Sequence, residues 1–130
     1  MLMRCRFELF VADLDVAIDF YTRVLGFGLR QRDESYAFVV RDEVRIGFGL
    51  IADLPPTDDG PGFSQERVLA GRGAGVELVL EVGDLNGVYR VVQASGHRVA
   101  EPLRRQPWGL TDFRIADPDG YYLRITNVVG

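Results

Sequence analysis

The chain has 130 residues, of which 47% are hydrophobic and 26% are charged, and its formal net charge is −4. This length and composition indicate one globular domain with a hydrophobic core and exclude a disordered chain. The acidic balance and the absence of a basic run argue against a nucleic-acid-binding protein. No apolar stretch approaches the roughly 18 residues of a membrane-spanning helix, so a membrane protein is not expected.

The reactive residue types are few. Cys5 is the only cysteine and His97 the only histidine, so neither an internal disulfide nor a pair of histidine metal ligands can form. All 15 basic residues are arginine, which excludes Schiff-base chemistry and a lysine general base. The first ten residues are too short and too charged for a signal peptide. Together with the lone cysteine, this predicts a cytoplasmic protein.

The first half of the chain reads as a strand, a helix and three further strands. In the stretch 6–11, apolar residues alternate with Arg6, Glu8 and Phe10, which is typical of a strand. Asp13 is a suitable N-cap for a helix that Gly26 would end. Strand-like runs follow at 27–32, 36–40 and 44–50, the last two joined by a tight turn.

The second half repeats this plan. In the stretch 76–82, apolar residues alternate with Glu77, Val79 and Glu81, and Asp84 is placed to cap a helix that Gly96 would end. Asp13 and Asp84 are 71 residues apart, as are the valines two positions before them. Three strands are then expected at 97–102, 111–116 and 121–128, the last two joined by an Asp-Pro-Asp-Gly turn.

Two such halves predict an α+β fold of two βαβββ modules, about 4–51 and 76–128, within a single domain spanning 1–130. The segment 52–75 is rich in Pro, Gly and Asp and is expected to be a connecting loop, with room for a short helical turn. Helices would cover one side of each sheet, so the other side of these curved, mixed sheets is expected to face a groove or a partner.

This layout, with DLDVAIDFYTRVLGF and the closing DPDGYYLRI, resembles the vicinal oxygen chelate superfamily over nearly the whole chain. The superfamily includes glyoxalase I, extradiol dioxygenases, epimerases, fosfomycin-resistance enzymes and bleomycin-resistance binding proteins. The resemblance implies a glyoxalase/bleomycin-resistance-like fold. It leaves the function open because one fold carries many chemistries.

The resemblance also locates the positions that bind metal in the enzymes of this superfamily. They fall here on Arg6, Gly47, Glu77 and Arg124. Arginine has no acceptor and stays protonated, so it cannot bind a divalent metal, which needs several oxygen or nitrogen ligands. The interpretation is that no metal or other cofactor is bound. Arg6, Glu77 and Arg124 would instead form an ion cluster, or each would simply be solvated.

Strand alternation places further charged and aromatic residues on the same side as this cluster, including Arg114. In QPWGLTD, Trp108 lies in a loop and resembles the Trp-Gly segment of bleomycin-resistance proteins. It would stack on a planar ligand, or else pack at a sheet end or a dimer contact. The residues predicted to bind a ligand are Arg6, Glu8, Phe10, Phe38, Glu77, Glu81, Trp108, Tyr122 and Arg124.

The leading hypothesis is a non-enzymatic protein of the bleomycin-resistance type. It would sequester a planar or aromatic small molecule, such as an antibiotic, in grooves of a homodimer. The first alternative is an enzyme of the same superfamily, with metal at an unforeseen site or with Glu77 and Glu8 as acid–base groups. The second is a protein without a ligand, in which the groove serves assembly.

Overall fold

A computed structural model describes residues 1–129. They contain two four-stranded mixed sheets, with strand orders β1-β4-β3-β2 and β5-β8-β7-β6. The chain divides into two compact units, 1–72 and 73–130, which we call the N-terminal unit and the C-terminal unit. Each unit has the order strand, helix and three strands, which confirms the predicted α+β fold class. Within residues 1–129, no helix is long and apolar enough to cross a membrane.

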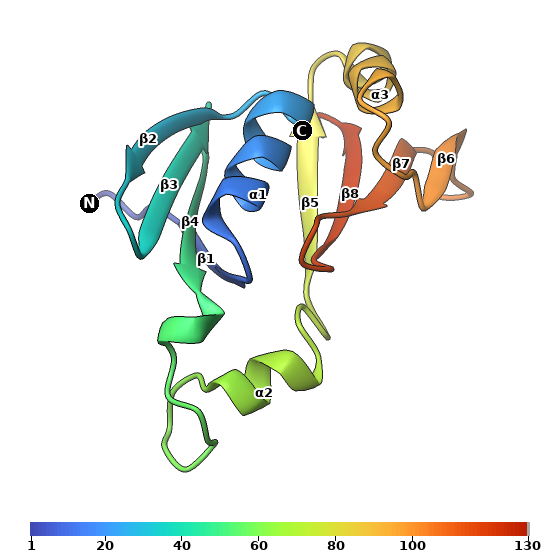
Figure 1. The fold of residues 1–130 in the computed structure, drawn as a ribbon. Helices are drawn as coiled ribbons and strands as arrows, with labels where there is room; N and C mark the ends of the chain where they lie inside the picture. Colours follow the sequence, from blue (N-terminus) through green and yellow to red (C-terminus); the bar gives the residue numbers. More distant parts are fainter. Residues whose placement is uncertain (130) are drawn as a thin grey trace. The chain divides into compact units, whose positions relative to one another are not determined.

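The N-terminal unit is built from β1 (Phe7–Val11), α1 (Leu14–Asp19), β2 (Gly28–Arg32), β3 (Tyr36–Arg41) and β4 (Val44–Leu50). β1 runs parallel to β4, whereas β2–β3 and β3–β4 are antiparallel pairs. Helix α1 packs on β3 and β4 (Figure 1). This side of the sheet carries the buried core residues, among them Leu9, Val11, Ala37, Val39, Ile46 and Phe48.

The first helix begins as the sequence predicts but changes geometry halfway. The side chain of Asp13 accepts a hydrogen bond from the backbone N–H of Val16, which caps α1. Beyond Asp19 the chain forms a π-helical turn, Phe20–Val24. The hydroxyl of Thr22 donates to the carbonyl of Ile18 at 2.7 Å, and this competes with the regular helical bond to the same carbonyl.

The segment between the sheets is more ordered than a plain loop. It begins with a 3-10 turn, Ile51–Asp53, and contains helix α2, Gln65–Ala70. The buried Ser64 caps α2 by accepting a hydrogen bond from the N–H of Arg67 at 3.1 Å. This helix groups with the N-terminal unit rather than standing apart from both modules.

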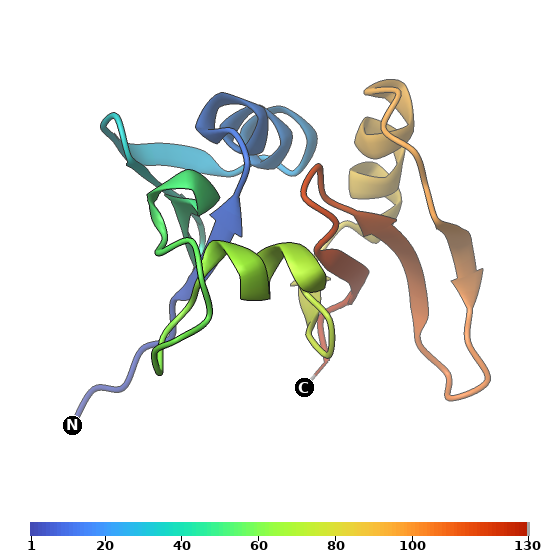
Figure 2. The same cartoon turned by 60° about the horizontal axis from the view of Figure 1, so that its bottom comes forward.

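The C-terminal unit is built from β5 (Glu77–Val82), α3 (Leu85–Ala94), β6 (Glu101–Arg105), β7 (Thr111–Ala116) and β8 (Tyr122–Asn127). β5 runs parallel to β8, whereas β6–β7 and β7–β8 are antiparallel pairs. Helix α3 packs on β8, and the β6–β7 hairpin forms the outer part of the unit (Figure 2). The core includes Leu78, Val92, Phe113, Ile115, Leu123 and Ile125.

One predicted strand is displaced along the chain. We expected a strand at 97–102, but β6 covers Glu101–Arg105. The segment before it is held by other contacts: His97 Nε2 lies 2.7 Å from the carbonyl oxygen of Ala116, and the N–H of Ala100 donates to Arg114. The pairing of β6 with β7 shifts between Glu101 and Arg104, where Pro102 has no N–H to donate.

Candidate functional site

The side of the N-terminal sheet opposite α1 carries polar and aromatic residues from three strands. Alternation in β1, β3 and β4 places the core residues on the α1 side and leaves the next residue of each strand on the other side. We call this surface the N-terminal open face and define it by Arg6, Glu8, Phe10, Tyr36, Phe38, Arg45 and Gly47. It includes all four ligand-binding residues predicted for this half of the chain.

A carboxylate and a phenol meet at the centre of this face. The hydroxyl of Tyr36 donates to Glu8 and lies 2.9 Å from each carboxylate oxygen. Glu8 is paired in the sheet with Gly47, and a Cβ atom at position 47 would overlap both the Glu8 carboxylate and the Tyr36 hydroxyl. A residue without a side chain at 47 is therefore what allows this hydrogen bond.

The Glu8–Tyr36 pair has an electrostatic consequence. Burial raises the pKa of Tyr36 above its ordinary value, and the hydrogen bond to the Glu8 carboxylate raises it further. The nearby guanidinium groups of Arg6 and Arg45 act in the opposite direction and do not cancel the rise. Tyr36 is thus held as a neutral hydrogen-bond donor.

Phe38 is the aromatic centre of the same face. The Cζ atom of Arg45 lies 5.3 Å from the centroid of the Phe38 ring, and that of Arg6 lies 6.0 Å from it. Both are within the range of cation–π attraction. Arg6 also lies 3.8 Å from Glu8, with both side chains about half exposed. Arg6 is therefore a solvated surface cation rather than part of a buried cluster within this unit.

A second aromatic contact was not predicted from the sequence. The rings of Phe10 and Phe63 are 4.7 Å apart, and Phe63 is 59% exposed. Phe63 directly precedes the cap of α2, in a segment of prolines and glycines. The sequence feature that could have identified Phe63 is that it is the sole aromatic residue in that segment. Phe10 thus belongs to a small aromatic surface at the end of the N-terminal open face.

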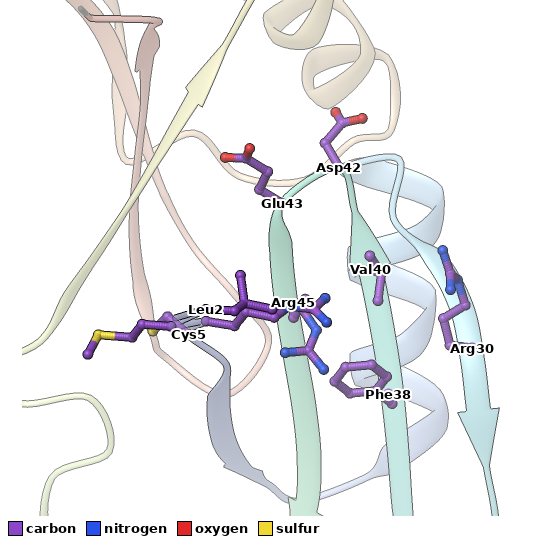
Figure 3. Close-up of a pocket in the computed structure, with 10 residues that line it drawn as sticks. Leu2, Cys5, Arg30, Phe38, Val40, Asp42, Glu43 and Arg45 are labelled. Atoms are coloured by element: carbon purple, nitrogen blue, oxygen red, sulfur yellow. The ribbon is translucent and has the colours of Figure 1, made fainter.

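A cavity of about 690 Å³ opens beside Phe38. Its walls come from β2, β3, β4 and the segment before β1 (Figure 3). Figure 3 shows Phe38 with Arg45 and Arg30 on the neighbouring strands, whereas Asp42 and Glu43 lie at the β3–β4 turn. Phe38 is the one lining residue that the sequence analysis named as ligand-binding. The lining residues are Leu2, Met3, Arg4, Cys5, Arg30, Phe38, Val40, Asp42, Glu43 and Arg45.

The C-terminal sheet has a matching surface, which we call the C-terminal open face and define by Glu77, Glu81, Asp112, Arg114, Tyr122 and Arg124. The predicted ion pair between Glu77 and Arg124 is present, with Arg124 Nη2 2.9 Å from Glu77 Oε1. Their side chains remain 34% and 27% exposed, so the pair is neither freely solvated nor fully buried. The predicted three-residue cluster with Arg6 stays a prediction.

Arg114, on β7, connects this strand to the edge strand β6. It stands directly opposite Arg124 in the β7–β8 pairing. Its Nε lies 3.6 Å from Asp112 and 3.7 Å from Glu101. Burial would lower the pKa of Arg114, but the hydrogen bond to Tyr122 and the charge of Asp112 leave it raised, so the side chain remains a cation.

Asp112 is a buried polar residue that the sequence analysis did not single out. It is 1% exposed, and one of its oxygens accepts a hydrogen bond from Gln106 Nε2 at 2.9 Å. Its Oδ2 atom has no hydrogen-bond partner among residues 1–129. The sequence feature that could have identified Asp112 is its position two residues before Arg114, which places both on the side of β7 away from the core.

Trp108 lies in the turn between β6 and β7 and is 57% exposed. The N–H of Gly109, with φ of 96°, donates to the carbonyl of Gln106 across this turn. A tryptophan so exposed offers a broad apolar surface to a ligand or a partner. Glu81 is also exposed, and it marks the end of the C-terminal open face on β5. The binding roles of both residues stay predictions.

The four residues that the resemblance assigns to metal positions do not suit a divalent ion. Arg6 and Arg124 offer no acceptor, and Gly47 offers no side chain. Glu77 is the single carboxylate in the set, and it is already paired with Arg124. Among residues 1–129, no group of three or more His, Cys, Asp or Glu side chains is placed to hold a metal ion.

The chain is similar to known bleomycin resistance proteins. A bleomycin resistance protein of Geobacillus stearothermophilus is 28% identical over 116 residues, which cover 84% of each chain. The structure of the bleomycin resistance determinant encoded on transposon Tn5 matches with a TM-score of 0.71 and 26% identity, covering 97% of this chain and 98% of that one.

Two further solved structures are similar over nearly the whole chain. A bleomycin-binding protein complexed with bleomycin matches with a TM-score of 0.69 and 25% identity, over 98% of this chain and all of that one. TioX from Micromonospora sp. ML1 has a TM-score of 0.78 at 22% identity, over 98% and 99% of the two chains. The family model for the Glyoxalase/Bleomycin resistance protein/Dioxygenase superfamily matches residues 5–125. This match, which confirms the resemblance seen in the sequence, shows that the chain belongs to that superfamily.

Proposed function

We propose that this protein binds a planar or aromatic small molecule, such as an antibiotic, and protects against it by sequestration. The observation that carries the proposal is the cavity of about 690 Å³ beside Phe38 on the N-terminal open face. Small-molecule sites typically have volumes of about 300–1,000 Å³, with aromatic walls and a few placed polar groups. The similarity to proteins named for bleomycin resistance supports the same function.

In this proposal, the ligand is held by aromatic faces and by charged groups at their edges. Phe10 and Phe38 would supply the aromatic contacts of the N-terminal open face, and Arg6 and Glu8 its charges. In the C-terminal unit, Trp108 is exposed at the end of its hairpin and would supply an aromatic contact. The C-terminal open face would itself bind a ligand through its charged and polar residues: Glu77, Glu81, Tyr122 and Arg124.

We further propose that the protein is a cytoplasmic homodimer whose ligand grooves lie between subunits. Each open face carries aromatic and charged residues together, which suits a surface closed by a second copy of the chain. Cys5 is exposed, so a reducing compartment would keep it as a free thiol.

A thermal-shift screen of antibiotics and metabolites tests the binding function. A ligand at 100 times its Kd should stabilise the protein by about 2.7 kcal/mol. Trp108→Ala should leave the unfolding temperature without ligand nearly unchanged, because the side chain is 57% exposed, and should weaken binding of an aromatic ligand about tenfold or more. A complete panel that stabilises nothing, or a hit that is unaffected by Trp108→Ala and Phe38→Ala alike, would contradict the proposal.

A second candidate function rests on the Glu8–Tyr36 pair. A carboxylate and a neutral phenol in direct contact can accept and donate a proton, as an acid–base enzyme of this superfamily would require. Glu77, predicted as a partner of Glu8 in such chemistry, is instead engaged by Arg124. Turnover of a ligand found in the screen, lost in both Glu8→Gln and Tyr36→Phe, would establish the enzyme. Metal analysis of protein purified without chelator would separate this from a metal-dependent route.

A further inference from the structure

The cavity beside Phe38 has a chemical character that narrows its ligand. Its apolar walls come from Leu2, Met3, Phe38 and Val40, and three arginines line it as well: Arg4, Arg30 and Arg45. A cavity that pairs an aromatic wall with several guanidinium groups suits a molecule with an apolar body and an anionic group.

The three arginines of the cavity lack acidic partners among the described residues. Within residues 1–129, the side chains of Arg4, Arg30 and Arg45 form no hydrogen bond and lie more than 4.0 Å from every carboxylate, although Arg45 lies over the Phe38 ring. Several arginines outside the cavity are paired with acids, for example Arg32 with Asp15 and Arg67 with Asp58. The cavity therefore contains three guanidinium groups that have no acidic partner among the described residues.

The two acidic residues of the lining do not supply the missing partners. Asp42 and Glu43 belong to the β3–β4 turn, and Figure 3 shows their carboxylates at the turn, whereas Arg30 and Arg45 lie further along the strands beside Phe38. Asp42 adopts a φ of 51°, as expected for a tight turn. An anionic group placed between Arg30 and Arg45 would thus meet two donors and stay clear of the acidic turn.

We propose that this cavity binds an aromatic or otherwise apolar molecule bearing a carboxylate, sulfonate or phosphate. The ring packs on Phe38 and Val40, and the anionic group is held by Arg30 and Arg45. This inference rests on the proposed small-molecule binding function and adds the charge class of its ligand. It also separates this chain's ligand from a cationic drug, which the same arginines would repel.

The test uses three naphthalene probes with the same ring position substituted: naphthalenesulfonate, naphthalenemethanol and naphthylmethylammonium. Binding to the full-length protein is measured by calorimetry at low and at high salt. The sulfonate should bind at least about tenfold more tightly than the alcohol, the ammonium should bind least, and salt should weaken only the sulfonate. Equal binding of all three probes, or no binding of the sulfonate, overturns the proposal.

Variants then locate the site. Arg30→Gln and Arg45→Gln should each reduce sulfonate affinity several-fold, and the double variant by at least about tenfold. Arg90→Gln, an exposed arginine of α3, is the matched control and should bind as the unaltered protein does. If the double variant does not fold, Arg30→Gln by itself tests the site. This variant should fold, because the Arg30 side chain is exposed and has no acidic partner among the described residues. Unchanged affinity in Arg30→Gln overturns the assignment.

Cys5 gives an independent readout because it is the only cysteine, is exposed and lines the cavity. Saturating sulfonate should slow its alkylation by iodoacetamide several-fold in the unaltered protein and in Arg90→Gln, but not in the double variant. Unslowed alkylation overturns the location. An antibiotic that binds while the three probes behave alike would leave the proposed function standing and refute this inference. Sulfonate binding without any antibiotic hit would support this inference and the binding of small molecules, and would contradict the role in protection against an antibiotic.

Discussion

Replacing Glu77 by alanine should destabilise the C-terminal unit measurably, because Arg124 would lose its one ion-pair partner in the described part of the chain. The two side chains are 2.9 Å apart, and the side chain of Glu77 is 34% exposed and that of Arg124 27% exposed. Fully exposed pairs contribute about 0.2–1 kcal/mol. Breaking a fully buried pair costs about 3–5 kcal/mol because an uncompensated charge remains.

The Glu77–Arg124 pair is partly exposed, so the cost of breaking it lies between the values for fully exposed and fully buried pairs. Among residues 1–129, Arg124 Nε is buried without a hydrogen-bond partner, so the guanidinium depends on Glu77 for compensation. Arg114, directly across the β7–β8 pairing, adds a second positive charge beside it. We therefore expect Glu77→Ala to lower the free energy of unfolding by about 2 kcal/mol. For a chain of this size, that is a decrease of roughly 6–8 °C in Tm.

Glu81→Ala is the matched control, because Glu81 lies four residues further along β5 on the same face and is exposed. Glu81→Ala should lower the free energy of unfolding by no more than about 0.5 kcal/mol. Urea unfolding followed by fluorescence measures both variants, and Trp108, the sole tryptophan, reports on the C-terminal unit. A double-mutant cycle with Arg124→Ala isolates the pairwise energy. Equal costs for the two glutamates, or a coupling below about 0.3 kcal/mol, would refute the reasoning.

Four further predictions follow from the geometry. Glu8→Gln should lower the pKa of Tyr36, which ultraviolet titration measures. The protein loses folding stability as the pH rises from about 10 through this raised pKa, and this loss should be smaller in Glu8→Gln. Gly47→Ala should separate Glu8 from Tyr36 and lower the same pKa, at a stability cost of about 1 kcal/mol or less. Asp84→Ala should cost about 1 kcal/mol by removing the α3 cap at Gly87. Light scattering should return a dimer at micromolar concentration; a monomer would contradict the assembly.

The sequence alone determined the repeated plan and the two faces of each sheet. Local features carry both results: apolar alternation in strands has a period of two, and Asp13 and Asp84 cap helices through their own neighbouring backbone groups. The sequence did not predict the π-helical turn after Asp19 or the displacement of β6 along the chain. Both depend on competing hydrogen bonds, one from the hydroxyl of Thr22 and one to the distant carbonyl of Ala116.

Tertiary structure decided which residues of a face become partners. The order β1-β4-β3-β2 pairs Glu8 with Gly47, and the missing side chain there lets Glu8 reach Tyr36, 28 residues away. The same order brings Arg30 and Arg45 to either side of Phe38, as Figure 3 shows. Alternation indicates a side of a strand but not the neighbouring strand or its register. Strand order therefore determined the hydrogen bonds of the open faces and the charge of the cavity.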